Sequence, residues 1–146
     1  GDIDTVACQR LINAANGMSV TFHRAFDMCR DPHKALEELV SLGCDRVLTS
    51  GQSPTAEAGI ELLEKLVKQA DNRIIIMPGC GVNSNNAAKI LQATGANEIH
   101  ASARKSVGSG MLFRNSSVSM GNSDNDEYAR KETDVNEVRA IVNSIK

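Results

Sequence analysis

The sequence predicts an α/β fold with a parallel sheet, because helical and strand patterns alternate along the chain up to residue 103. The helical segments carry apolar residues at the helical period, and the strand segments show a two-residue period or a continuous apolar run. The connections are short, so we expect right-handed βαβ crossovers. The expected helices are 4–16, 31–43, 53–70 and 85–95, and the expected strands are 19–26, 45–51, 72–81 and 97–103.

Local start and stop residues justify the helices. Leu11 lies on the apolar stripe of the first helix, and Gly17 follows as its C-terminal stop. In the second helix Asp31 is the expected N-cap, Pro32 takes the first helical position and Gly43 ends the helix. The third and fourth helices have similar apolar stripes, which indicates that all of them pack against one core.

Alternation in the strands predicts which side chains face the helices. The helix-facing side of a parallel sheet is apolar, so we expect Val20 and Phe22 on that side. Thr21 and His23 then face the other way. In the last strand the expected helix-facing residues are Ile99 and Ala101, and the opposite residues are Glu98, His100 and Ser102.

The C-terminal third follows a different pattern. Residues 104–133 are rich in Ser, Asn and Gly and are expected to form a long loop. A terminal helix is expected at 134–146, because Asp134 and Glu137 have capping-box spacing ahead of an apolar stripe. We therefore expect 1–146 to be one domain that includes this loop and helix.

Composition limits the class of protein. The 146 residues are 41% hydrophobic and 23% charged with a formal net charge of -2, which is ordinary globular composition. Both signs are interspersed, so we expect no nucleic acid partner. No run reaches the roughly 18 apolar residues of a membrane span, and the first residues do not resemble a secretory signal. We expect no membrane partner and a cytoplasmic location, with the nucleus left open.

Ionisable residues in the first strand suggest a site. His23 lies near the carboxyl end of that strand, and Arg24 begins the following turn. Carboxyl ends of strands are where α/β sheets and barrels place their sites. We expect His23 or His100 as an acid/base group and Arg24 as an anion clamp. The alternative is that the histidines are satisfied core groups and Arg24 pairs with Asp27 or Glu98.

Glycines after the third strand suggest a place for an anion. Gly79 and Gly81 let the backbone approach a ligand and point N–H groups at it, just before a helix. We include Thr49, Ser50 and Ser102 in this expected anion site because they lie at neighbouring strand ends. The alternative is a tight strand-to-helix turn without a ligand.

The cysteines lack the spacing of a zinc or redox motif. The chain has four, and no pair is separated by two residues. Cys29 and Cys80 fall just beyond strand carboxyl ends, where His23 and His100 are also expected. Thiolate and imidazole are ligands that Cu(I) prefers, so these four residues form the expected metal set. Each cysteine taken alone is also explained as a small buried hydrophobe.

Five segments resemble the CutC copper-homeostasis family, in the same order and across the whole chain. They read VTFHRAFDM, RVLTSG, IIIMPGCGV, EIHASAR and MLFRNSSVSMG. The resemblance implies a cytosolic TIM-type barrel that acts in copper homeostasis by binding Cu(I). Because the family is longer, it implies that this chain corresponds to the C-terminal half of a (β/α)8 barrel, with four parallel strands and flanking helices.

Two other functions stay open at this stage. One is a TIM-barrel enzyme that acts on a small anionic metabolite, and the other is a truncated product without activity. Half a barrel also leaves sheet edges and an apolar inner face uncovered. We therefore expect copper as a partner and a homo-oligomer as the state of the isolated chain.

Overall fold

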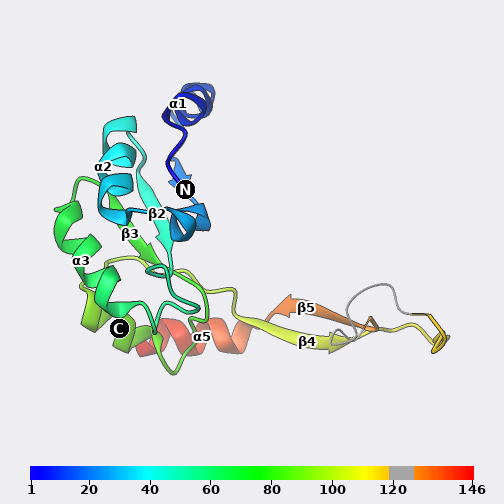
Figure 1. Cartoon of the computed structure of the whole chain (residues 1–146). Helices are drawn as coiled ribbons and strands as arrows, with labels where there is room; N and C mark the ends of the chain where they lie inside the picture. Colours follow the sequence, from blue (N-terminus) through cyan, green and yellow to red (C-terminus); the bar gives the residue numbers. More distant parts are fainter. Residues whose placement is uncertain (119–126) are drawn as a thin grey trace.

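A three-stranded parallel sheet forms the centre of the molecule (Figure 1). The computed structural model of the chain describes residues 1–118 and 127–146. The strands are β1 (Thr21–Phe22), β2 (Arg46–Thr49) and β3 (Ile75–Pro78), in the order β1-β2-β3. Val47 lies between Phe22 and Ile76 in the register of the sheet. The predicted parallel α/β arrangement is thus confirmed.

The fourth predicted strand is reduced to a single bridge, which corrects the prediction of four parallel strands. Gly79 and His100 form this parallel bridge, and the His100 N–H donates to the Pro78 carbonyl oxygen at 2.9 Å. Ala103 then turns the backbone into the left-handed region with a φ of 45°. The segment 97–103 therefore lies beside β3, as predicted, but does not continue its ladder.

Successive α-helices pack side by side, and those that follow β1, β2 and β3 cover one face of the sheet. Asp31 caps α2 by accepting from the N–H groups of His33 and Lys34, and Gly43 ends the helix in the left-handed conformation. Within the described residues no helix is long and apolar enough to cross a membrane. The helices are α1 (Thr5–Ala14), the 3-10 helix η1 (Arg24–Met28), α2 (Pro32–Leu42), α3 (Ile60–Ala70), α4 (Ala87–Thr94) and α5 (Val135–Ser144).

The third helix begins later than the sequence predicts. Residues 53–59 form turns instead of the first part of a helix, and Ser53 donates its hydroxyl to the Gly51 carbonyl oxygen. Gly59 lies against the Ser50 backbone so closely that a Cβ there would clash with the Ser50 carbonyl oxygen. This contact holds the 51–59 segment over the end of β2 and delays the helix.

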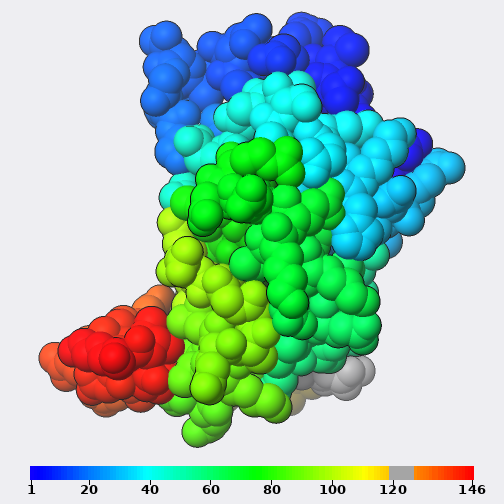
Figure 2. Space-filling view, turned by 90° about the vertical axis from the view of Figure 1, so that its left-hand side faces the viewer, coloured from blue at the N-terminus to red at the C-terminus, as the bar shows by residue number. Residues whose placement is uncertain are grey.

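The two faces of the sheet differ in burial. Figure 2 shows the helical side, where α2 (cyan), α3 (green) and α4 (yellow-green) lie in a row between α1 and α5. Val47 and Ile76 point to this side and are buried, as the predicted alternation requires. Leu48, Ile75 and Met77 alternate with them and remain only partly buried.

An antiparallel hairpin replaces part of the predicted loop 104–133, which is a second correction. β4 (Arg104–Gly108) pairs with β5 (Ala129–Thr133), and the hairpin projects away from the sheet (Figure 1). Lys105 lies opposite Glu132 in the register, a pairing that favours the two strands. Residues 119–126 of the predicted loop lie outside the described residues. The predicted terminal helix is confirmed as α5 and packs on α4.

Candidate functional site

A cavity lies at the carboxyl edge of the sheet, where β2, β3 and the 100–102 segment end. Its volume is about 230 Å³. It brings together a guanidinium, a thiol, an imidazole and a hydroxyl, which are side chains able to bind and react with ligands. Its lining residues are Arg24, Leu48, Cys80, Gly81, Val82, His100, Ala101 and Ser102.

A buried carboxylate fixes the arginine of this cavity. The Arg24 Nε donates to Asp27 Oδ2 at 2.7 Å, and its Nη2 donates to the Ser50 hydroxyl at 2.9 Å. The Asp27 side chain is only 7% exposed, whereas the Arg24 side chain is 42% exposed. Burial by itself raises the pKa of Asp27, but hydrogen bonds from Thr49 and Arg24 outweigh it and hold that pKa below its usual range.

The alternative prediction, that Arg24 pairs with Asp27 or Glu98, is therefore confirmed for Asp27. Arg24 pairs with Asp27, while Glu98 pairs with Arg46 through two hydrogen bonds of 2.9 and 3.1 Å. The sequence pattern predicts Asp27 only as a possible partner of Arg24 and not as the anchor of the network. The three-residue separation of Arg24 and Asp27 on η1 was the available local signal.

Two predicted anion-binding hydroxyls serve this network instead of facing the cavity. Thr49 and Ser50 are fully buried. Thr49 donates its hydroxyl to Asp27 Oδ1 at 2.5 Å, and Ser50 donates its backbone N–H to the same oxygen at 3.0 Å. They position Asp27, which in turn positions Arg24. Ser102 lines the cavity, so it is the hydroxyl of the predicted set that is open to a ligand.

The two predicted histidines have different surroundings. Both are exposed and neither lies on the helix-packed face, as the alternation predicts. The His23 Nδ1 accepts from the Ala25 N–H at 3.1 Å and caps η1. His100 lines the cavity beside Ser102. His100 is therefore the better placed of the two for a role in the site.

Gly79 and Gly81, in the turn after β3, differ in what they contact. A Cβ on Gly79 would meet the Leu48 Cδ1 at 2.5 Å and the His100 Cβ at 3.3 Å, so the missing side chain leaves room for Leu48 and for the close approach of His100 to β3. Gly81 lines the cavity and has a φ of 73°. Cys80, between them, has a φ of 90°, which is unfavourable for a residue with a Cβ.

The predicted metal ligands are not gathered at one point. Cys80 lines the cavity and donates its thiol to the Pro54 carbonyl oxygen at 3.3 Å, while the buried Cys29 sulfur accepts from Gln52 Nε2 at 3.3 Å. Across residues 1–118 and 127–146, no three His, Cys, Asp or Glu side chains lie together as a metal site. Copper binding by Cys29, Cys80, His23 and His100 stays a prediction.

The guanidinium and the thiol of the cavity are neighbours. The pKa of Arg24 is raised mainly by its hydrogen bond to Asp27, against the effect of burial, with smaller contributions from the charge of Asp27 and from Cys80. Burial raises the pKa of the thiols of Cys8, Cys29 and Cys44, none of which lines this cavity. Cys80 is thus the thiol that shares a cavity with a cation.

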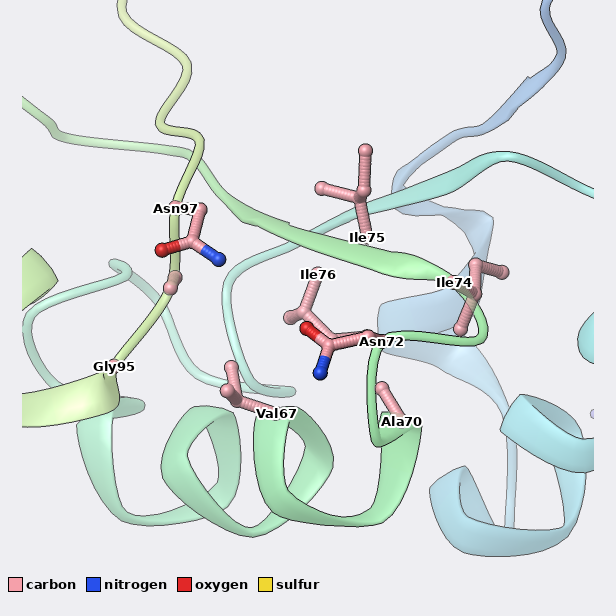
Figure 3. A pocket seen from close by; sticks show the side chains of 9 residues that line it. Val67, Ala70, Asn72, Ile74, Ile75, Ile76, Gly95 and Asn97 are labelled. Carbon is pink, nitrogen blue, oxygen red and sulfur yellow. The ribbon is translucent and has the colours of Figure 1, made fainter.

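A second hollow lies near the opposite end of β3 and lacks such chemistry. Its volume is about 90 Å³, and Figure 3 shows Ile76 of β3 and Val67 of α3 on the sides of these elements that face each other. Asn72 and Asn97 supply its polar side chains. Parallel α/β sheets bind ligands at the carboxyl ends of their strands, so the first cavity is the candidate site. The residues around the hollow are Val67, Ala70, Asn72, Ile74, Ile75, Ile76, Gly95, Ala96 and Asn97.

Parallel strands with helices on one face and a cavity at the carboxyl edge define the class as an α/β protein with a parallel sheet. A family model described as the CutC family matches residues 1–105. The chain therefore belongs to the CutC family, as its sequence motifs indicate. The hairpin and α5 lie beyond the matched residues, apart from the first two residues of β4.

Relatives and a solved structure agree with this assignment. A family protein CutC from Bacteroides thetaiotaomicron is 53% identical over 147 residues, covering 100% of this chain and 59% of the relative. The copper homeostasis protein cutC homolog of Mus musculus is 50% identical, covering 97% of this chain and 52% of the relative. The chain thus spans between half and two thirds of the length of these relatives. The crystal structure of CutC from Streptococcus agalactiae matches with a TM-score of 0.65 and 39% identity, over 68% of this chain and 49% of that one.

Proposed function

We propose that this protein acts in copper homeostasis and binds Cu(I) at the carboxyl edge of its sheet. The observation that carries the proposal is that Cys80 and His100 line one cavity. A thiol and an imidazole are the ligand types that select a soft cation such as Cu(I). Relatives from mouse and human carry the name copper homeostasis protein cutC homolog, which supports copper as the cargo. A cytoplasmic location belongs to the same proposal.

Titration with Cu(I) under anaerobic, reducing conditions tests this function. A competing chromophoric chelator reports the affinity of the chain for Cu(I). We expect Cys80→Ser and His100→Gln to weaken binding markedly, because a hydroxyl or an amide is a poor ligand for a soft ion. Cys8→Ser is the matched control, since Cys8 lies on α1 outside the cavity. Equal affinity in all of these variants would contradict the proposed site, and Cys29→Ser tests the remaining predicted thiol ligand.

The anchored arginine favours a second candidate function, an enzyme that acts on a small anionic metabolite. Arg24 is held by Asp27 and Ser50 before any ligand arrives, and its side chain stays partly exposed. A preorganised cation costs little reorganisation when an anion binds or when charge develops. In this candidate, Arg24 binds the anion and His100 acts as the acid/base group, with Gly81 and Ser102 beside it.

Protection against thermal unfolding by inorganic phosphate tests the second candidate. We expect phosphate to raise the unfolding temperature of the parent chain and not that of Arg24→Gln. Arg30→Gln is the control, because Arg30 is an exposed arginine that pairs with Asp2. Protection that survives in Arg24→Gln, or no protection of the parent, would count against an anion site at Arg24.

A further inference from the structure

A nucleophile and a cation occupy the same cavity, and the functions above use only one of them at a time. We propose that the cavity takes a small anionic electrophile, whose anionic group pairs with Arg24 while the Cys80 thiolate attacks its electrophilic carbon. This inference rests on the second candidate function and adds a nucleophile to it. In the step, the thiol first gives its proton to solvent. A sulfur–carbon bond then forms, the bond from carbon to the leaving group breaks, and the leaving group departs with the electron pair.

The position of the cation is the first support. The side chains of Asp27 and Ser50 hold the Arg24 guanidinium by hydrogen bonds of 2.7 and 2.9 Å. The arginine side chain remains 42% exposed, so an anionic group in the cavity can reach it. Arginine binds carboxylate and phosphate groups through paired donors, which defines the ligand class as a small carboxylate or phosphate ester.

The position of the thiol is the second support. Cys80 is partly exposed, lines the cavity with Arg24 and His100, and lies in a turn whose backbone is held in an unfavourable conformation. The thiolate is the reactive form of cysteine, and a neighbouring guanidinium favours the approach of an anionic reagent. Cys29 and Cys44 are buried, and Cys8 lies near the carboxylate of Asp4 instead of a cation. The other cysteines are therefore internal references in the same chain.

Two alkylating reagents of similar size test the inference on the metal-free chain. Iodoacetate carries a negative charge and iodoacetamide does not, while both lose iodide when a thiolate attacks. Mass spectrometry of each cysteine peptide gives the two alkylation rates. For Cys80 we expect the iodoacetate-to-iodoacetamide ratio to exceed that of an uncharged model thiol, N-acetylcysteine amide, by about fivefold, the effect of one partly exposed charge pair. A Cys80 ratio equal to that of the model thiol would overturn the inference.

Variants assign the selectivity to Arg24. We expect Arg24→Gln to lower the Cys80 ratio to that of the model thiol, Arg24→Lys to keep part of it, and Arg30→Gln to leave it unchanged. Cys29 contacts Gln52 in the adjoining loop, so slow alkylation of Cys29 shows that this loop stays folded. An unchanged ratio in Arg24→Gln with Cys29 still protected would overturn the inference. If Cys29 becomes reactive in Arg24→Gln, this loop is no longer folded and the parent chain provides the test. Inorganic phosphate must then lower the rate of Cys80 with iodoacetate more than its rate with iodoacetamide. An equal effect of phosphate on both rates would overturn the inference.

The outcomes also separate this inference from the functions above. Phosphate protection without charge selectivity at Cys80 would retain the anion site and remove the nucleophile. If Cys80 prefers iodoacetate but phosphate does not protect the chain against thermal unfolding, the result would support Arg24 beside the Cys80 thiol. It would exclude phosphate as a ligand of the cavity. Cu(I) affinity is measured independently of both.

Discussion

Two arginine–carboxylate pairs lie near opposite ends of the sheet, and they differ in burial and support. The Arg24–Asp27 pair at the carboxyl edge has a carboxylate that is 7% exposed and bonded by Thr49 and Ser50. The Arg46–Glu98 pair starts at the first residue of β2, with side chains that are 25% and 36% exposed. The first pair uses buried groups to hold one cation at a cavity. The second ties the 97–103 segment to β2 in a partly solvated place.

Removing the buried carboxylate should have the largest effect. Asp27→Ala leaves Thr49, Ser50 and Arg24 without their shared acceptor, and we expect a loss of about 2–3 kcal/mol in the free energy of unfolding. Urea unfolding followed by circular dichroism measures the loss. A change below about 1 kcal/mol would place the Arg24–Asp27 pair among ordinary surface pairs.

Adding one carbon at the glycine turn should have a smaller effect. In Gly79→Ala the new methyl group meets Leu48 and His100, so one of them must move. We expect a loss of about 1–2 kcal/mol in the free energy of unfolding, as in other overpacked sites. Gly108→Ala is the matched control, because a Cβ there has open space around it. A neutral Gly79→Ala would contradict the expected loss and would show that Leu48 moves aside at little cost.

Lowering the pH should remove the contribution of the Asp27 carboxylate to stability. The folded-state pKa of Asp27 is lowered, so its contribution to stability is present above the unfolded value of about 3.9 and is lost as pH falls through the folded value. We expect the stability difference between the parent and Asp27→Asn to shrink below about pH 4. Unfolding curves of the two proteins from neutral to acid pH measure this difference. A constant difference would indicate that the pKa of Asp27 is unshifted.

The Arg46–Glu98 pair should contribute least. We expect Glu98→Gln to cost at most about 1 kcal/mol in the free energy of unfolding, because both partners are partly solvated. High salt should shrink this cost further, while it should change the Asp27→Ala effect little. A larger loss in the free energy of unfolding for Glu98→Gln than for Asp27→Ala would contradict the expected difference between the two pairs.

The open face of the sheet leads to a prediction about association. Leu48, Ile75 and Met77 are only partly covered, and single exposed hydrophobics on α1, such as Leu11 at 71% exposure, add apolar surface. We expect the isolated chain to self-associate or to bind hydrophobic dyes. Sedimentation that shows a compact monomer, together with cooperative unfolding and no dye binding, would contradict this expectation.

Local features of the sequence predict part of this structure well. The second helix is bounded by Asp31, Pro32 and Gly43, and its observed limits agree with those residues because capping depends on neighbours in the chain. The order of strands and helices also follows from periodicity. The placement of Arg24 and His100 at the carboxyl edge follows from their positions near the ends of the predicted strands.

The differences arise from contacts between distant parts of the chain. The late start of α3 depends on Gly59 packing against Ser50, and the hairpin depends on pairing of Lys105 with Glu132 across a long connection. Neither contact leaves a short-range pattern. The Asp27 network likewise joins η1 to the end of β2, more than twenty residues away along the chain. The sequence pattern indicates Asp27 as a possible partner of Arg24 but not as the centre of this network.

We expect ligands to bind at the carboxyl edge and not in the aliphatic hollow near the other end of β3. Two-dimensional amide NMR of the isotope-labelled chain, titrated with Cu(I) and separately with inorganic phosphate, measures where they bind. We predict that the amide signals of Arg24, Gly81 and His100 shift with one or both ligands, while those of Asn72 and Asn97 stay in place. Shifts confined to the residues of the hollow, or no saturable shift at the carboxyl edge with either ligand, would show that the carboxyl edge is not the binding site.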